Sequence, residues 1–306
     1  MKPLRLVTES LLWLIEFLIA LGILLPLGIL PRWLSLKTGE FLGLCMFILL
    51  GRRRRIALKN IEIAQKGGLR LSNTPMKTVC MHFINLGRSL SELSMLSLGK
   101  ESIMKDITFE NIEHLIGAKA RGQGVIFITG HCGNWELLAL APSWKGIPIS
   151  VVARPLNNPY LNKFVKRLRV RFGNKVIYKS GALKEILSLL RNGECVGILI
   201  DQSVAEDEAV ITEFFGEKVY TTKMPALIAM KTGAVVVPAF INYLGKGKHR
   251  ISVGEEIKLR ITDSPEEDVV FNTSVFSGYI ERYIKENPSE WLWIHRRWKL
   301  SHGRRY

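Results

Sequence analysis

The sequence predicts an α/β fold with a largely parallel central sheet flanked by helices, joined to an N-terminal helical segment that anchors the chain in a membrane. Two observations carry this prediction. From about residue 105 onward, short β-rich runs alternate with helix-periodic stretches, and near-continuous apolar strands need helices on both faces of their sheet. Before that point, the first 50 residues are more apolar than the core helices of soluble proteins.

The predicted anchor begins with a long apolar run. Residues 11–30 carry a single charge, Glu16, and about 20 apolar residues cross a bilayer core. A signal peptide and a buried soluble helix are the alternatives, but a signal peptide has a shorter apolar core and a small-residue cleavage site, which this stretch lacks. Residues 41–50 are too short to span a bilayer alone. We therefore interpret residues 1–50 as either one tilted span or a hairpin in one leaflet.

The distribution of charge favours a membrane and an acidic partner over nucleic acid. The chain has 306 residues, of which 47% are apolar, and a net charge of +16. Four arginines follow the anchor at residues 52–55, and arginines beside a membrane segment mark the cytoplasmic side and attract anionic lipids. The four cysteines form no CxxC pair, which is typical of a reduced compartment without disulfides. Residues 51–306 are expected to form one catalytic domain.

The remaining elements follow from periodicity and turn signals. Helices are expected at residues 52–66 and 74–96, the second with Thr74 as its cap and Pro75 at its first helical position. Residues 181–193 have the period of a further helix between two strands. The expected strands are residues 107–109, 125–129, 149–153, 175–178, 195–200, 235–241 and 249–253.

The stretch "GHCGNWE", residues 130–136, places a histidine directly after the predicted strand 125–129. In α/β sheets, ligands bind at the carboxyl ends of the strands. Glu136 falls about one turn into the following helix, and we expect its carboxylate to hold one ring nitrogen of His131 so that the other nitrogen is basic. A substrate hydroxyl would then be the nucleophile, and backbone N–H groups near Gly133 would meet the oxyanion.

Other chemistries fit these residues less well. A zinc site needs three or four ligands, and His131, Cys132 and Glu136 lack the spacing of zinc-binding helices. Cys132 as a nucleophile would need a histidine partner, but the side chains of adjacent residues diverge. A histidine that caps a strand beside a solvated glutamate is the purely structural alternative. We expect no metal and no other cofactor.

The motifs occur in an order that resembles a known family. "GVIFITGHCGNWELLAL" is similar to the His-x4-Asp/Glu block of membrane acyltransferases, in the form found in the late acyltransferases of lipid A biosynthesis, the lauroyl and myristoyl transferases. "VVARPLNNPYLNKFVKRLRVRFG", "GILIDQSV", "FFGEKVYTT" and "NPSEWLWIHRRWK" resemble its later blocks in the same order. The resemblance covers nearly the whole chain. The sequence departs from the family at Cys132 and at residues 219–220, and the second departure leaves the length of the acyl chain open.

The resemblance implies a glycerol-phosphate-acyltransferase-like fold and an O-acyltransferase. A fatty acyl chain would move from an acyl carrier protein thioester to a hydroxyl of a lipid A precursor, with His131 as general base and Glu136 as its orienter. The enzyme would lie in the bacterial inner membrane with its catalytic domain on the cytoplasmic face. Sister enzymes acylate mannosylated phosphatidylinositol. Another glycolipid or a lysophospholipid is therefore the alternative acceptor, and a non-enzymatic lipid-binding protein is the alternative class.

Five further residues are expected to bind substrate. Arg154 follows the next strand and suits a phosphate or developing negative charge, although a surface ion pair is the alternative. Asn158 belongs to the Arg-plus-Asn block of the resemblance, and Arg169 lies on a basic helical face that suits anionic headgroups or an acidic carrier. Asp201 and Gln202 end another apolar strand, where Asp201 would hold Arg154 or a substrate hydroxyl, or would only form a turn. The segment "WLWIHRRWK" is interpreted as a packing helix rich in cation–π contacts.

Overall fold

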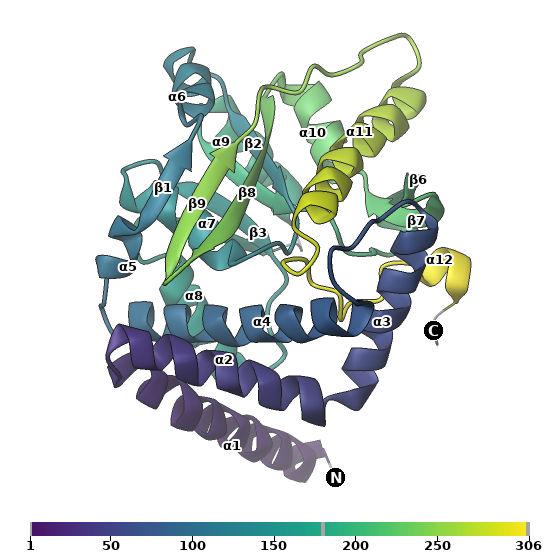
Figure 1. Cartoon of the computed structure of the whole chain (residues 1–306). Coiled ribbons are helices and arrows are strands. Elements are labelled where there is room, and N and C mark those ends of the chain that lie inside the picture. The colour runs from purple at the N-terminus through teal and green to yellow at the C-terminus, as the bar shows by residue number, and fades with distance from the viewer. Residues whose placement is uncertain (1, 179–180, 304–306) are drawn as a thin grey trace.

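A seven-stranded sheet runs through the middle of the molecule (Figure 1). The computed structural model describes residues 2–178 and 181–303 of the chain. The sheet has the order β1–β9–β8–β2–β5–β3–β4, with β1 Ile107–Glu110, β2 Val125–Thr129, β3 Ile149–Ala153, β4 Lys175–Tyr178, β5 Cys195–Leu199, β8 Val235–Gly245 and β9 Lys248–Val253. Within the described residues, its neighbouring strands are parallel except for β8 and β9. The predicted α/β class and the largely parallel sheet are confirmed.

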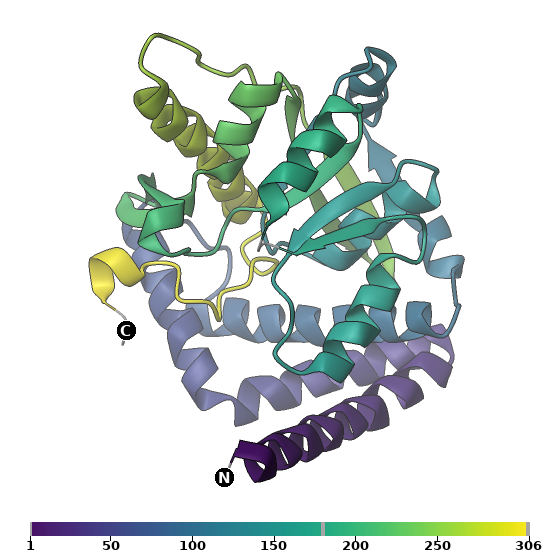
Figure 2. The same cartoon turned by 180° about the vertical axis from the view of Figure 1, so that it is seen from behind.

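Helices cover both faces of the sheet, which is why its central strands are apolar on both sides (Figures 1 and 2). One face is covered by α6 Glu113–Ala120, α7 Trp135–Trp144 and α8 Pro159–Arg169, and the other by α9 Ala182–Arg191, α10 Met224–Thr232 and α11 Pro265–Glu286. Alternate residues of each strand point to opposite faces. In β2, Val125 and Phe127 therefore belong to the core beneath α7, whereas Ile126 and Ile128 belong to the core beneath α9 and α11.

A two-stranded hairpin, β6 Ala209–Phe214 and β7 Glu217–Thr222, lies outside the main sheet. It follows a short 3-10 helix at Glu206–Glu208. Phe215 and Gly216 form the two-residue turn between the strands, with φ values of 50° and 73°. Positive φ at both turn positions matches the twist of paired strands. No strand is expected here from the sequence, so the hairpin is an addition to the predicted fold.

A layer of helices precedes the sheet and lies below it in Figure 1. It consists of α1 Lys2–Ile29, α2 Arg32–Leu49, α3 Gly51–Lys66 and α4 Pro75–Ser97, and a short α5 Ser102–Lys105 leads into β1. Thr74 caps α4 as predicted, because its hydroxyl accepts a hydrogen bond from the backbone N–H of Lys77 over 3.3 Å. The helices α2 and α4 approach closely at glycines. A Cβ atom on Gly39 would lie 2.4 Å from the carbonyl oxygen of Gly87.

The helix α1 is long and apolar enough to cross a membrane. Its candidate span is Glu9–Ile29, and only 11% of the most apolar window is buried inside the protein. The helices α2 and α3 form a second apolar pair, bent by 88° at the break between them. Leu36 of α2 is buried in the core beneath the sheet. The helix α1 is therefore a candidate membrane anchor, and the predicted boundary at residue 50 stays a prediction.

The tryptophan-rich C-terminal segment packs in the core without forming the predicted helix. Trp291 and Trp298 are each at most 1% exposed, and their rings lie 5.7 Å from the ring of Phe214, centroid to centroid. The guanidinium of Arg297 lies 5.0 Å from the centre of the same ring. The packing and the cation–π contact are confirmed, but the helix is wrong, since α12 comprises only Lys299–His302. Instead, the backbone of Trp291 forms an isolated β-bridge with Cys132.

Candidate active site

A cavity of about 650 Å³ opens at the carboxyl ends of the central strands and runs beneath α7. Most of its wall is apolar, from Phe127 and Val151 of the sheet to Leu138 of α7. Several polar residues that we expect to bind or activate substrate also line the cavity. They are His131, Glu136, Arg154, Arg169 and Gln202. A largely apolar cavity with a few convergent polar groups is typical of a ligand site.

His131 and Asp201 form a hydrogen-bonded pair at the rim of this cavity. Nδ1 of His131 lies 2.8 Å from Oδ1 of Asp201, and the backbone N–H of His131 donates to Oδ2 over 2.9 Å. The ring of Trp135 packs against the imidazole in a T-shaped contact, with 5.1 Å between the centroids. These contacts fix both the position and the orientation of the imidazole.

The register of two strands explains why His131 and Asp201 meet. β2 and β5 are adjacent and parallel, and Thr129 lies opposite Leu199. Residues 131 and 201 therefore leave the sheet at the same level. The predicted place of Asp201 at this edge is confirmed, but its partner is His131 rather than Arg154.

The surroundings of Asp201 keep it ionised. Its side chain is 1% exposed, and its Oδ2 accepts a further hydrogen bond from Nε1 of Trp291 over 2.8 Å. Burial alone would raise the pKa of this carboxyl, but the attraction of His131 and the hydrogen bonds from His131 and Trp291 outweigh it. The pKa therefore lies below its ordinary value. An ionised carboxylate only accepts hydrogen bonds, so Nδ1 of His131 carries a proton and, in the neutral imidazole, Nε2 is the basic nitrogen.

The imidazole of His131 is partly exposed and lines the cavity. The His131 side chain is 22% exposed, whereas that of Asp201 is almost fully covered. The amide Nε2 of Gln202 lies 3.3 Å from Nε2 of His131 and is placed to donate to it. Gln202, which is predicted at this edge of the sheet, thus lies beside the nitrogen that would accept a substrate proton.

Glu136 pairs with Arg169 at the same rim. Nε and Nη2 of Arg169 donate to the two carboxylate oxygens of Glu136 over 2.9 and 2.5 Å. The side chains are 14% exposed for Glu136 and 23% for Arg169. Glu136 lies in the first turn of α7 and Arg169 is the last residue of α8. The ion pair therefore joins the start of α7 to the end of α8 across the mouth of the cavity.

This pairing differs from the expected contact between Glu136 and the His131 ring. In the part of the chain that the structure describes, the ring nitrogens of His131 have Asp201 and Gln202 as their hydrogen-bond partners. The physical reason is geometric, because β5 brings Asp201 level with His131 whereas α7 directs Glu136 toward α8. The requirement for Glu136 in catalysis stays a prediction.

The backbone around Gly133 is already hydrogen-bonded. The N–H of Gly133 donates to the carbonyl oxygen of Glu290 over 2.8 Å, so it is not free to serve as the expected oxyanion donor. The φ of Gly133 is +55°, and a Cβ atom there would lie 2.2 Å from the carbonyl oxygen of Ile241. Only glycine permits this close approach. Gly133 therefore allows the loop of residues 130–134 to pack against β8 and the C-terminal segment.

The alternative chemistries find little support. Cys132 is 1% exposed and does not line the cavity. Burial and the negative charges of Asp201 and Glu290 raise the pKa of its thiol well above the ordinary value, whereas a nucleophilic cysteine needs the thiolate. Within residues 2–178 and 181–303, no three His, Cys, Asp or Glu side chains gather as metal ligands would.

Two further predicted site residues have different surroundings. Arg154 is exposed and lines the mouth of the cavity, as expected. Asn158 does not line it. The Asn158 side-chain oxygen caps α8, while its Nδ2 donates to the carbonyl oxygen of Trp13 over 2.8 Å and to Glu16 over 3.0 Å. Asn158 thus ties the loop after β3 to α1, and its expected contact with substrate stays a prediction.

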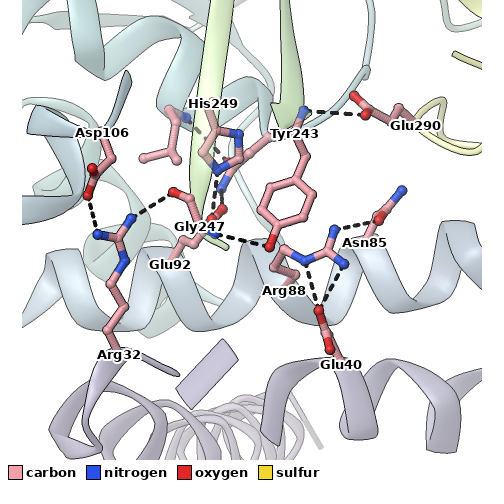
Figure 3. Close-up of polar contacts among 12 residues, drawn as sticks. Arg32, Glu40, Asn85, Arg88, Glu92, Asp106, Tyr243, Gly247, His249 and Glu290 are labelled. Atoms are coloured by element: carbon pink, nitrogen blue, oxygen red, sulfur yellow. Dashed lines mark hydrogen bonds and ion pairs between the residues drawn. The ribbon is translucent and has the colours of Figure 1, made fainter. Parts of the chain in front are cut away.

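A buried polar network of α4 supports the loop of residues 130–134, and its contact between Glu92 and His249 is drawn in Figure 3. Oε1 of Glu92 lies 2.7 Å from Nε2 of His249, and Oε2 accepts from Nδ2 of Asn134 over 2.8 Å. The Asn134 side-chain oxygen accepts from the N–H of Leu137 and so caps α7. Asn134 has a local signal, since a capping residue precedes the apolar run of a helix. Glu92 lies 42 residues earlier, and no local pattern connects the two.

The same network fixes the N-terminal helices to the β8–β9 hairpin (Figure 3). Arg88 of α4 forms an ion pair with Glu40 of α2 over 3.0 Å, and its guanidinium lies 3.7 Å from the ring centre of Tyr243 in β8. Arg32 pairs with Asp106 and donates to the carbonyl oxygen of Gly247 over 2.7 Å. The N-terminal helices and the loop of residues 130–134 are therefore held by one network of polar contacts.

Comparison with known proteins gives a consistent assignment. The family of bacterial lipid A biosynthesis acyltransferases matches residues 5–300 of this chain. A lipid A biosynthesis acyltransferase of Haemophilus influenzae is 27% identical over 198 residues, which are 64% of this chain and 60% of that protein. The lipid A biosynthesis palmitoleoyltransferase of Escherichia coli is 26% identical over 284 residues, which are 89% of each chain.

A relative named for a different acceptor is nearly as similar. The phosphatidylinositol mannoside acyltransferase of Mycobacterium tuberculosis is 25% identical over 253 residues, which are 80% of this chain and 78% of that protein. The family match itself runs from the N-terminal helix to the tryptophan-rich segment. On that match, this chain belongs to the bacterial lipid A biosynthesis acyltransferase family.

Proposed function

We propose that this protein is a membrane-bound O-acyltransferase that moves a fatty acyl chain from an acyl carrier protein thioester to a hydroxyl of a lipid A precursor. The observation that carries the proposal is the His131–Asp201 pair at the rim of a largely apolar cavity. The pair supplies a base for the hydroxyl, and the cavity supplies an apolar wall for the acyl chain. Membership of the family supports the class of lipid.

The proposed reaction begins with proton transfer to His131. Nε2 takes the proton of the acceptor hydroxyl while the hydroxyl oxygen attacks the thioester carbonyl carbon. Asp201 stays ionised and stabilises the imidazolium through Nδ1. The tetrahedral intermediate then collapses, the carbon–sulfur bond breaks, and the proton passes from Nε2 to the departing sulfur. The products are the acylated lipid and the free carrier thiol, and no acyl-enzyme is required.

Gln202 is the side chain best placed to meet the oxyanion of this intermediate. Its amide nitrogen lies 3.3 Å from the nitrogen that would accept the substrate proton, so it is close to any carbon attacked by the activated hydroxyl. The backbone N–H of Gly133 is engaged elsewhere. Amide donors in oxyanion holes contribute about 10²–10³-fold to kcat.

The Glu136–Arg169 pair is proposed to position a positive charge at the mouth. The bidentate contact holds the Arg169 guanidinium in one orientation. Arg154 adds a second, exposed guanidinium on the same rim. Two arginines in this place suit the phosphate groups of a lipid A precursor. In this proposal Glu136 acts through Arg169, and Asp201 orients the imidazole.

The outer face of α8 supports an acidic carrier as the acyl donor. Lys163, Lys166 and Arg167 lie on this helix, and opposite charges speed and orient protein association. The N-terminus of α8 is joined to α1 through Asn158. With α1 in the bacterial inner membrane and residues 52–55 on its cytoplasmic side, the mouth of the cavity would meet a lipid from the bilayer and a carrier from the cytoplasm.

A mannosylated phosphatidylinositol is the second candidate acceptor. The observation that favours it is the similarity to the mycobacterial phosphatidylinositol mannoside acyltransferase over 80% of this chain. The proposed chemistry is the same for both acceptors, because each offers a hydroxyl on an anionic lipid.

The test offers one acyl carrier protein thioester to a tetraacylated lipid A precursor, a mannosylated phosphatidylinositol and a lysophospholipid. Mass spectrometry identifies the products of the wild type and of His131→Ala. We expect acylation of the lipid A precursor by the wild type and a loss of nearly all transfer in the variant. Transfer to the lysophospholipid alone would contradict the acceptor, and near-wild-type turnover by a folded His131→Ala protein would contradict the mechanism. The same acyl chain on coenzyme A tests the carrier.

A further inference from the structure

Gly197 occupies a position where the backbone does not need a glycine. It lies in the middle of β5, between β2 and β3, and its φ is not positive. Glycine weakens the interior of a strand, and in such a place it marks close approach of another backbone or of a ligand. A Cβ atom on Gly197 would lie 3.2 Å from Cγ2 of Ile149 and 3.9 Å from Cγ1 of Val151. Both neighbours are side chains, so no backbone crowds this site.

Other glycines show what crowding by backbone looks like. A Cβ atom on Gly124 would lie 2.3 Å from the carbonyl oxygen of Leu190, and one on Gly133 would lie 2.2 Å from that of Ile241. At those positions the fold itself excludes a side chain. At Gly197 the nearest atom is a side-chain methyl of Ile149, which would have to move by a few tenths of an ångström to admit a Cβ atom. The glycine also leaves open the space in front of β5.

That space is the cavity of the candidate active site. Gly197 lines it, together with its direct partners in the sheet, Phe127 of β2 and Val151 of β3. Gly197 is partly exposed although it lies in a central strand, whereas its neighbours Val196 and Ile198 are 0% and 3% exposed. The cavity therefore reaches the backbone of β5 at Gly197, below the strand ends that carry the polar groups.

The cavity offers two apolar directions away from His131. One passes over Gly197 to Ile149 at the start of β3. The other passes toward the opposite edge of the sheet, to Phe109 of β1 and Val253 of β9. The missing side chain lies on the first path, whereas the second path is lined by Ala239 of β8 and Ile251 of β9 together with Phe109 and Val253.

We propose that the transferred acyl chain crosses the sheet at Gly197 and that the absence of a side chain there sets the length of chain the enzyme accepts. The inference rests on the proposed function, because it takes the cavity as the site of the donor acyl chain. A methyl group on β5 would narrow the path between Phe127 and Val151, so long chains would no longer reach Ile149. Shorter chains would end before the obstruction and would still react.

The test measures the acyl selectivity of the full-length protein with saturated thioester donors from decanoyl to stearoyl. Gly197→Ala is expected to lower the use of the longest chains that the wild type accepts, relative to shorter ones, by on the order of 10-fold. Val151→Ala removes methyl groups from the same path and is expected to shift the preference toward longer chains. Val253→Ile is the matched control, because it adds one methylene to the other path and is expected to leave the preference unchanged.

Binding of free fatty acids separates this inference from the proposed function. Displacement of a fluorescent fatty acid needs neither an acceptor nor a carrier protein, and it should show the same shift toward shorter chains in Gly197→Ala. If the lipid A precursor is not acylated but this shift is seen, the proposed acceptor fails and the inference holds. If neither donor selectivity nor fatty acid binding changes in Gly197→Ala, the inference fails.

Two other outcomes would also overturn it. If Val253→Ile prefers shorter acyl chains and Gly197→Ala does not, the acyl chain runs toward β9. A change in the KM for the acceptor with unchanged donor selectivity would show that the cavity holds a chain of the acceptor. Thermal unfolding checks each variant, and if Gly197→Ala does not fold, unchanged selectivity in Val151→Ala decides against the inference.

Discussion

The carboxylate of Asp201 holds His131 twice, through the ring at Nδ1 and through the backbone N–H. The two residues are 70 positions apart in the chain and meet because β2 and β5 are parallel neighbours in register. One buried carboxylate therefore sets both the tautomer of the imidazole and the conformation of the loop that carries it.

Asp201→Asn should lower kcat by about 10²–10⁴-fold, the range associated with general acid–base groups. An asparagine amide keeps the size of the side chain but cannot stabilise the imidazolium as a charge does. Steady-state rates with a saturating thioester donor measure the effect. Trp291→Phe removes one hydrogen bond to Asp201 while the charge remains, and it should cost much less. Equal rates for wild type and a folded Asp201→Asn protein would remove Asp201 from the mechanism.

Glu136→Gln and Arg169→Gln should each reduce kcat/KM, because each leaves its partner as a partly buried group without its ion pair. If Glu136 acts through Arg169, the double variant should be little worse than either single variant. The double-mutant cycle should then give a coupling energy of about 0.5–3 kcal/mol. Additive losses would show that Glu136 acts independently of Arg169, as an orienter of the His131 ring would.

Glu92→Ala should destabilise the fold by about 1–3 kcal/mol, because it leaves the buried donors of His249 and Asn134 without their acceptor. Denaturant unfolding measures the change. Glu110→Ala is a matched control, since the Glu110 side chain is 48% exposed and surface changes usually stay within about 0.5 kcal/mol. The prediction fails if the two variants unfold at the same denaturant concentration.

Stability should fall as the pH drops below about 6.5, in part because of His82. Burial lowers the pKa of His82 from its ordinary value of 6.5 to about 3. The unfolded chain takes up a proton near pH 6.5 that the folded chain does not accept until about pH 3. The free energy of unfolding therefore decreases through this window, by about 1.4 kcal/mol per pH unit for one such group.

His82→Leu checks this assignment. Leucine removes the titrating group from the buried site in α4, so the midpoint of thermal unfolding should depend less steeply on pH between about 6 and 4 than it does in the wild type. His295, whose pKa burial lowers to about 4, remains in the variant and keeps part of the dependence. Parallel curves for wild type and His82→Leu would show that His82 does not contribute.

The main sheet could be predicted because its strands are short, apolar and separated by clear turn signals. β2 and β3 begin and end at the expected residues. The β6–β7 hairpin has no such signal, since Thr212 is buried while its neighbours Ile211 and Glu213 are exposed. Its apolar contacts come from α11 and from the tryptophans near the C-terminus, so only the tertiary structure shows why it forms.

The candidate base could also be predicted, because a histidine after a buried strand is a local feature. Asp201 could not be predicted as its hydrogen-bond partner. Glu136 is close in sequence to His131, but the direction of α7 takes its carboxylate to Arg169. The pairing of His131 with Asp201 depends on which strands are neighbours, and the order of strands is set by long crossovers rather than by any short motif.

The contacts of Trp291 also bear on the order in which the candidate active site is assembled during synthesis. The Trp291 indole binds Asp201 from 90 residues further along the chain, and the N–H of Leu292 donates to the carbonyl oxygen of His131. A chain leaves the ribosome with its N-terminal part first. The helix α1 and the whole central sheet are therefore made before the last supports of His131 exist. The candidate active site therefore gains its contacts with Trp291 and Leu292 only after the strands that carry it have been made.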